Sequence, residues 1–294
     1  MRGVVSAGMV AALQELGYGP HLFDAVFGSS AGSINGAYFI AGQAPYGTSI
    51  YFEDITGREF IDARRLASRR PVLDLGFLLG EVATTRKPLD TARVLAYREL
   101  YTIATNATTG KKTVFEPAGD AQTLLRHLQA GATIPFVAGA PYRVHDHTYV
   151  DASLAETIPW ETPLERGFDF VLALSTRPRN AVARASGAQR LLSAAWLRKT
   201  SPELRAMIEN RAASSPQRAR ALEEFTNNPT SGPYVYALCP DVADQSVRQL
   251  ERNPSALIAG ATAGYRAVAS ALGHPSPARF HTSGTFQGVF LTGS

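Results

Sequence analysis

The chain has 294 residues, of which 45% are hydrophobic and 18% are charged, and its formal net charge is +4. These are ordinary values for a globular protein, and the length allows a large α/β domain with a sizeable buried core. The arginines are scattered and form no long basic run, which argues against a nucleic-acid-binding protein.

Other compositional features bear on the cellular compartment. The single cysteine, Cys239, excludes an internal disulfide framework and fits a reducing compartment, and its apolar neighbours predict a small buried core residue. The N-terminus lacks the charged-then-apolar pattern of a signal peptide, and no stretch approaches the roughly 18 apolar residues of a membrane span. We therefore expect a cytoplasmic protein.

The first predicted elements are a helix and a strand–turn–helix unit. Apolar residues at helical spacing over 4–16 predict a helix that ends at Gly17. The apolar run 23–27 has the length of a strand, and a glycine- and serine-containing turn over 28–32 follows it directly. An apolar, alanine-rich helical stretch then continues to about residue 41.

The remaining chain predicts alternating strands and helices. Residues 42–89 are rich in Pro, Gly and charge, which indicates irregular connections with short helices. Next we expect strand 101–106, a turn at 108–110 and the hairpin partner 112–115. Helix 124–129, a strand at 149–150 and a central strand covered on both faces over 170–175 follow. The last expected elements are an Arg-rich helical region 188–225, with a polar break at 214–216, and helix 254–272.

This alternation predicts an α/β fold, a three-layer α/β/α sandwich with a mainly parallel sheet. No linker divides the sequence, so we expect one domain over 1–294. Its core is expected over about 1–180, followed by a helical lid or C-terminal region over about 181–294.

The strongest chemical motif is Gly28-Ser29-Ser30-Ala31-Gly32, which fits the pattern Gly-x-Ser-x-Gly. In this pattern the serine occupies a strained turn between a strand and a helix, and we expect the flanking glycines to be required where a Cβ would collide. The helix that follows presents its positive end and free amide groups to the serine hydroxyl, which favours an oxyanion there. Ser30 is therefore the predicted nucleophile.

A serine nucleophile needs an adjacent base. The six histidines lie in polar or loop-like segments, and too little sequence precedes Ser30 for the usual α/β-hydrolase order of strands and oxyanion loop. Asp151 follows the strand at 149–150 and precedes small residues, which leaves room for a close neighbour. Local capping is the alternative role of a single aspartate in such a turn.

Several motifs together resemble the patatin-like phospholipase family. Arg2-Gly3-Val4 resembles the end of its oxyanion loop, Gly-Gly-Gly-x-Arg-Gly, and Gly28–Gly32 resembles its nucleophile elbow. Ala104-Thr105-Asn106 and Ala132-Thr133-Ile134-Pro135 resemble two later segments, and Asp151-Ala152-Ser153 stands where the family has Asp-Gly-Gly or Asp-Gly-Ala. The similarity runs to about Arg177.

The resemblance implies a patatin-like fold and a Ser30–Asp151 dyad that cleaves lipid esters through an acyl-enzyme. The oxyanion would be bound by amides of Gly3 and Val4, with Arg2 holding the loop or meeting a phosphate.

Two departures from the family's pattern are expected to matter. Ala152 replaces a glycine, at a cost of about 1 kcal/mol if that residue needs a positive φ. The family's first strand and glycine triplet are missing before Met1, and each lost oxyanion donor would cost roughly 3 kcal/mol of transition-state stabilisation.

Two other functions remain open at this level. One is an esterase with a histidine base, for which His145, His147 and His274 are the candidates. The other is a catalytically impaired lipid-binding or regulatory protein that lacks a complete oxyanion hole. We expect a lipid ester as substrate, no cofactor or metal, and no nucleic-acid partner. The Arg-rich helices could form a lid or make peripheral contact with an anionic membrane surface, but a solvated helix face is the favoured interpretation of their arginines.

Overall fold

A computed structural model describes residues 1–275 apart from residues 69, 98, 136, 180–200, 230–231 and 245–246. Residues 188–200 of the predicted Arg-rich helical region, and part of the predicted lid region, therefore lie outside the described residues. No helix in the described ranges is both long and apolar enough to cross a lipid bilayer.

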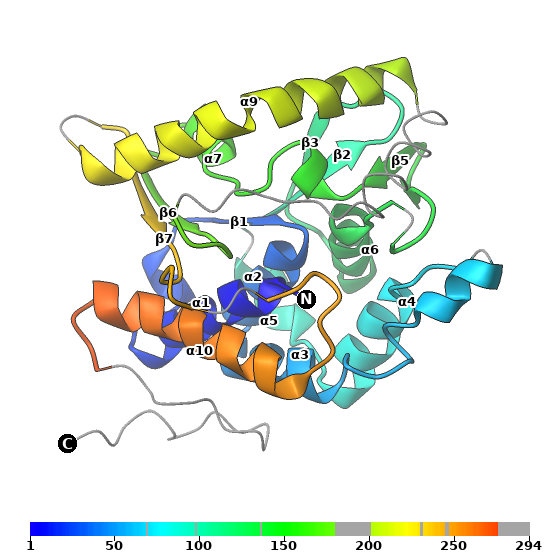
Figure 1. Cartoon of the computed structure of the whole chain (residues 1–294), viewed down its shortest axis with the longest axis horizontal. Helices are drawn as coiled ribbons and strands as arrows, with labels where there is room; N and C mark the ends of the chain where they lie inside the picture. Colours follow the sequence, from blue (N-terminus) through cyan, green and yellow to red (C-terminus); the bar gives the residue numbers. More distant parts are fainter. Residues whose placement is uncertain are drawn as a thin grey trace.

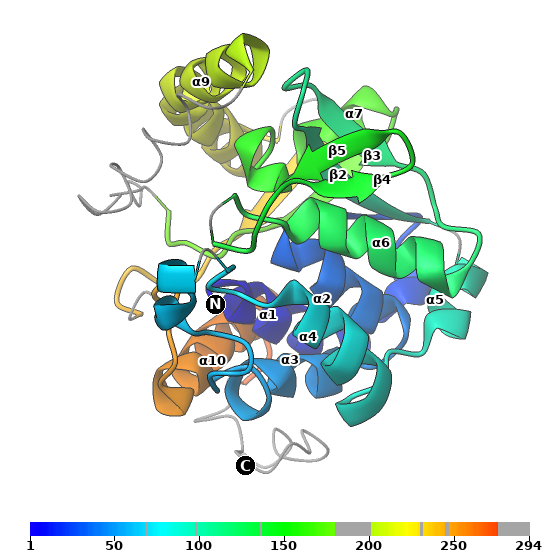
Figure 2. The ribbon, with the colours of Figure 1, turned by 90° about the vertical axis from the view of Figure 1, so that its right-hand side faces the viewer.

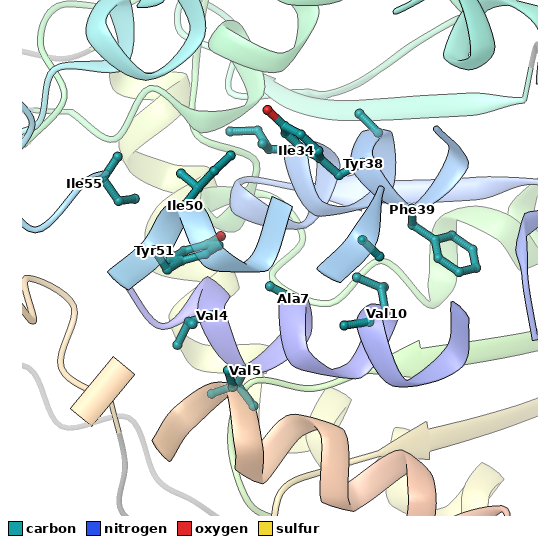
Figure 3. Close-up of a cluster of buried hydrophobic side chains, with 14 of the residues drawn as sticks. Val4, Val5, Ala7, Val10, Ile34, Tyr38, Phe39, Ile50, Tyr51 and Ile55 are labelled. Carbon is teal, nitrogen blue, oxygen red and sulfur yellow. The ribbon is translucent and has the colours of Figure 1, made fainter. Parts of the chain in front are cut away.

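Helices from both ends of the chain build the main core. They are α1 (Gly3–Glu15), α2 (Ala31–Ile40), α3 (Ala44–Glu53) and α10 (Pro254–Ala271). Figure 3 shows apolar side chains of α1, α2 and α3 pointing into one buried cluster. Helices α1 and α10 approach so closely that a Cβ on Gly264 would lie 1.9 Å from the carbonyl oxygen of Val5, so only glycine fits there. This packing fixes α1 against α10, and α1 also contacts α2 and α3.

Two sheets form the middle of the molecule. The first has the order β1-β2-β5-β4 with β3 paired to β2, and the second joins β6 and β7. Pairing is parallel for β1–β2 and β6–β7 and antiparallel for the pairs that involve β3, β4 and β5. The strands are β1 (Val26–Ser29), β2 (Leu100–Asn106), β3 (Lys112–Phe115), β4 (Tyr142–Val144), β5 (His147–Val150), β6 (Phe170–Leu174) and β7 (Tyr234–Leu238).

Helices lie on both sides of these strands (Figure 1). The long helix α9 (Pro202–Asn227) and the short α7 (Glu161–Glu165) lie on one side, and α9 packs against β7. Helix α6 (Ala121–Ala132) contacts β2, β4 and β5 from the side that also holds α1 and α2, as the turned view shows (Figure 2). The result is the three-layer α/β sandwich that the sequence predicted.

The remaining elements are short and mostly connect these layers. They are η1 (Pro20–Leu22), η2 (Ala63–Ser68), α4 (Leu75–Phe77), the π-helix η3 (Leu78–Arg86), α5 (Thr91–Tyr97) and η4 (Ala152–Leu154). The section between residues 42 and 89 is more helical than predicted, because α3 and η3 bury apolar side chains despite the Pro and Gly content.

Two other sequence-based expectations are wrong. Helix α9 continues through Pro216 without the break predicted at 214–216; Pro216 is exposed, and a proline costs a helix one backbone hydrogen bond without always ending it. Among the described strands, β6 pairs only with β7, so it is an edge strand there and not a central one, and Phe170 at its start is 77% exposed. An unbroken apolar run indicates that a segment is hydrophobic, but it does not predict the number of neighbouring strands.

Candidate active site

Ser30 occupies the strained turn that the motif predicted. It follows β1 directly and precedes α2, and its backbone angles are φ 55° and ψ −129°. A residue with a side chain rarely adopts a positive φ, and such a conformation persists only where the surrounding structure enforces it. The strain is therefore held by the packing of α2 beneath the turn.

The two glycines of the motif differ in whether the surrounding structure requires glycine. A Cβ on Gly28 would lie 2.2 Å from Cα of Ser33, so the turn closes only with glycine at this position. A Cβ on Gly32 would have nothing within 4 Å, so the expectation that both glycines avoid a collision is wrong for Gly32. Gly32 lines the cavity at the start of α2, and the neighbouring backbone does not need it.

Asp151 comes to Ser30 from a part of the chain 121 residues away. The Ser30 Oγ donates a hydrogen bond of 2.5 Å to Oδ2 of Asp151, and the Ser153 amide donates one of 2.8 Å to Oδ1. The backbone of Asp151 is held by the carbonyl oxygen of Thr133, at 2.9 Å, and by the Thr105 hydroxyl, at 3.0 Å. Both carboxylate oxygens and both backbone groups of Asp151 therefore have fixed partners.

The environment of Asp151 changes its basicity. The residue is 1% exposed, and this burial raises the pKa of its carboxyl group, while hydrogen bonds from Ser153 and Ser30 lower it by a smaller amount. Ala152 does not have a positive φ, so the substitution of the family's glycine carries no backbone strain. Asp151 also caps the short helix η4 through Ser153, so the capping role and contact with Ser30 coexist.

A second link between the two halves of the site was not predicted from the sequence. The Ser29 hydroxyl donates to the backbone carbonyl oxygen of Glu156 at 2.7 Å. The Glu156 carboxylate is 1% exposed and accepts from the Glu161 amide, the Thr162 amide and hydroxyl, and the ammonium of Lys112. The segment after Asp151 is thus tied to the residue before Ser30. A single buried glutamate has no sequence signal that would have revealed this.

The start of α1 lies beside the turn. A Cβ on Gly3 would lie 2.5 Å from Cβ of Ala31, and the Gly3 carbonyl oxygen accepts 2.9 Å from the Asn35 side chain. The hydroxyl of Tyr51 donates in turn to Asn35 Oδ1 at 3.1 Å. Asn35 was also missed, although an amide side chain in an apolar helix was a usable signal.

The backbone amides near Ser30 differ in availability. The amide of Val4, an expected oxyanion donor, already donates to the carbonyl oxygen of Met1 at 3.1 Å, because the first turn of α1 is closed. The amides of Gly3 and Ala31 are the first donors of α1 and α2, and within the described ranges they have no hydrogen-bond acceptor. The structure therefore favours Gly3 and Ala31 over Val4 as anion-binding groups.

Arg2 also lines this region and is half-buried. Burial, and secondarily the positive charge of Arg177, lower the pKa of its guanidinium group. Neither arginine forms an ion pair with any residue that the structure describes. The predicted roles of Arg2, holding the loop or meeting a phosphate, stay predictions.

Ser30 and Asp151 open into a cavity of about 850 Å³. Its lining is mainly apolar and includes Phe39 of α2, Ile50 of α3 and Leu78 of η3. Among the described residues, no histidine lines this cavity and no group of acidic, histidine or cysteine side chains could hold a metal ion.

The three histidines considered as alternative bases lie elsewhere. His145 and His147 are exposed around the turn between β4 and β5, and His274 is exposed after α10. This placement contradicts the expectation of an esterase in which one of them activates Ser30.

Comparison with known protein families gives a match over the first half of the chain. The family model described as Patatin-like phospholipase matches residues 1–164. The chain belongs to the patatin-like phospholipase family. Members of this family generally hydrolyse lipid esters, which supports the assignment of this patatin-like protein to lipid acyl hydrolases. No curated protein matches the chain.

The matched segment contains most of the site. It begins at the first residue and ends within α7, so it includes Ser30, Asp151 and the Ser29–Glu156 link. Strands β6 and β7 and helices α9 and α10 of this patatin-like protein lie beyond the match, although α10 packs against α1 and both strands line the cavity.

Proposed function

We propose that this protein hydrolyses carboxylic esters of lipids through an acyl-enzyme, with Ser30 as nucleophile and Asp151 as its base. In the first step Asp151 takes the hydroxyl proton of Ser30 as Oγ attacks the ester carbonyl carbon, and the proton then passes to the departing alcohol. In the second step Asp151 takes a proton from water, which attacks the acyl-serine and releases the carboxylic acid and the free serine.

The observation that carries this proposal is the 2.5 Å hydrogen bond between Ser30 Oγ and Asp151 Oδ2 at a strained turn in an apolar cavity. The raised pKa of Asp151 makes its carboxylate a stronger base than an exposed aspartate, which suits proton transfer from a hydroxyl. The free amides of Gly3 and Ala31 would stabilise the negative charge on the carbonyl oxygen in the transition state.

A lipid ester is the substrate class that the apolar cavity and the family support. Acting on such a substrate from the cytoplasm requires peripheral contact with a membrane or micelle surface, which is part of this proposal. The described helix α9 holds four arginines and four glutamates, so it brings no net charge to an anionic surface. Co-sedimentation with vesicles of neutral and of anionic lipids measures whether charge contributes to this contact.

Active-site labelling with a fluorophosphonate, followed by mass spectrometry of the labelled peptide, tests the nucleophile. The wild-type protein and the control Ser68→Ala, at an exposed serine, should both be labelled at Ser30. Ser30→Ala should not be labelled. Equal labelling of wild type and Ser30→Ala would refute the assignment.

Ester hydrolysis with short-chain and long-chain acyl esters tests the base. Asp151→Asn should lower kcat by about 10²- to 10⁴-fold, the usual contribution of a positioned base. The control Asp146→Asn removes an exposed aspartate five residues earlier and should keep the wild-type rate. A wild-type protein that binds lipid vesicles but hydrolyses no ester would instead indicate a lipid-binding protein.

A further inference from the structure

Two neighbouring serine side chains attach the nucleophile to one short segment, residues 151–156, which we call the aspartate turn. The Ser30 hydroxyl donates to the Asp151 carboxylate at 2.5 Å, and the Ser29 hydroxyl donates to the Glu156 carbonyl oxygen at 2.7 Å. Asp151 and Glu156 are the two ends of the aspartate turn. A single hydrogen bond leaves two segments free to rotate about it, whereas two bonds also fix their relative orientation, on which a catalysed rate depends.

The aspartate turn is closed by its own hydrogen bonds. The amides of Ala155 and Glu156 both donate to the carbonyl oxygen of Ala152, at 2.9 and 2.7 Å. The Asp151 carboxylate accepts from the amide of Ser153 at 2.8 Å. Because these bonds link every part of the turn, a displacement of Glu156 at one end is passed to Asp151 at the other.

The Glu156 side chain anchors the far end of the aspartate turn. Its carboxylate is 1% exposed, and Oε1 accepts from the amides of Glu161 and Thr162, at 3.0 and 3.2 Å, at the start of α7. Oε2 accepts from the Thr162 hydroxyl and from the Lys112 ammonium, the latter at 3.3 Å. A carboxylate has about four acceptor sites, so these four donors fix both the position and the direction of the side chain.

One pair of strands supports both ends of the aspartate turn. Thr105 of β2 and Lys112 of β3 face each other in the antiparallel register. The Thr105 hydroxyl donates to the Asp151 carbonyl oxygen at 3.0 Å, and Lys112 binds the Glu156 carboxylate. Strand β1, which leads into Ser30, pairs with the same β2. The sheet therefore holds the base and the nucleophile from one frame, and Glu156 closes it.

We propose that the Glu156 side chain is a positioning residue for the Ser30–Asp151 dyad, and that it acts through its own carbonyl oxygen and the Ser29 hydroxyl. This inference rests on the proposed ester hydrolysis. Glu156 is not among the described residues that line the cavity, so it orients the dyad without a contact to the substrate. A buried ion pair is by itself a weak source of stability, because desolvation offsets the attraction, whereas four converging donors give geometric control.

The kinetics of Glu156→Gln are the first test. The glutamine keeps an oxygen for the two amides but turns an NH₂ group toward the Thr162 hydroxyl and the Lys112 ammonium, so one side of the anchor is lost. For ester hydrolysis, kcat per fluorophosphonate-labelled Ser30 should fall by about 10- to 100-fold, because a misplacement of about 1 Å can cost 10²-fold. KM should stay within about twofold of wild type. The control Glu165→Gln removes the exposed carboxylate that binds Lys112 at 2.6 Å and should keep the wild-type kcat.

Counting only labelled sites separates positioning from stability. A purely structural role would reduce the amount of folded protein and of labelled Ser30, and kcat per labelled site would not change. Thr162→Val removes one donor to Glu156 with little change in shape and should lower kcat per labelled site by a smaller factor. Thr162→Val decides the question if Glu156→Gln yields no folded protein. Wild-type kcat per labelled site in the variant that decides, or a raised KM with unchanged kcat, would overturn the proposal.

A double-mutant cycle tests the route through Ser29. In a Ser29→Ala background the link to Glu156 is already cut, so Glu156→Gln should change kcat by less than about threefold. Effects of the two substitutions that multiply would overturn the proposal. A wild-type protein without ester hydrolysis would overturn the proposed function and this inference with it. Wild-type hydrolysis that Glu156→Gln leaves unchanged would overturn this inference alone.

Discussion

Replacing Gly28 with alanine should damage both the fold and the site, whereas the same change at Gly32 should not. The added Cβ at residue 28 would lie 2.2 Å from Cα and 2.6 Å from the amide nitrogen of Ser33, where ordinary contact begins at 3.4 Å. Ser33 would have to move by about 1.2 Å, and the atoms that obstruct the Cβ are backbone atoms of α2. Overpacking of this kind typically costs about 1–3 kcal/mol of the free energy of unfolding.

The displacement would pass directly to the nucleophile. The amide and hydroxyl of Ser33 both donate to the carbonyl oxygen of Ser30, at 3.1 and 2.6 Å, so Ser30 moves with Ser33. The hydrogen bond to Asp151 leaves little room for such a shift, and a misplacement of about 1 Å can reduce a catalysed rate by roughly 10²-fold. Gly32→Ala meets no neighbouring atom and replaces glycine in a helix, which should stabilise the protein by about 0.5–1 kcal/mol.

Urea denaturation and the rate of fluorophosphonate labelling measure the two effects on the same pair of variants. Gly28→Ala should lower both the free energy of unfolding and the labelling rate, and Gly32→Ala should keep the wild-type labelling rate. Equal stability and labelling of Gly28→Ala and wild type would show that the turn is not held by the contact with Ser33. Equal damage by both substitutions would show that the motif is required as a whole and not for this contact.

Three further outcomes are expected. Asp151 must be ionised to act as a base, and its pKa is raised. The value of kcat/KM for ester hydrolysis should therefore fall on acidification at a pH above the usual aspartate pKa of about 3.9. A fall of kcat/KM that occurs only at or below this pH would contradict the effect of burial on Asp151. Ser29→Ala leaves the buried carbonyl oxygen of Glu156 without its donor and should lower the free energy of unfolding in urea by about 1–3 kcal/mol, with Ser29→Thr as the variant that restores it. Asn35→Ala removes the donor to the Gly3 carbonyl oxygen and should slow fluorophosphonate labelling while Ser30 still reacts; an unchanged labelling rate would show that the position of Gly3 does not matter.

The nucleophile turn was predictable because its requirements are local. A glycine that admits Ser33, a serine with positive φ and a helix directly afterwards lie within six consecutive residues, so the sequence displays them together. Helix and strand positions followed from periodicity for the same reason. Strand β6 shows the limit of such patterns, because its apolar run was compatible with two neighbouring strands and the described structure provides one.

The partners of Ser30 depended on contacts between distant segments. Asp151 was a plausible base in the sequence, but an isolated aspartate in a turn is equally well suited to capping, and only the fold brings its carboxylate to 2.5 Å from Ser30. The Ser29–Glu156 link and the support of Gly3 by Asn35 join residues 127 and 32 positions apart and follow no spacing rule.

Local sterics, which act over a few residues, were thus determined by the sequence of this protein alone. The burial that raises the pKa of Asp151, and the pairing of β6 with β7 alone among the described strands, were decided by the tertiary structure. Burial and strand pairing depend on which distant segments pack together, and one short stretch of sequence does not contain that information.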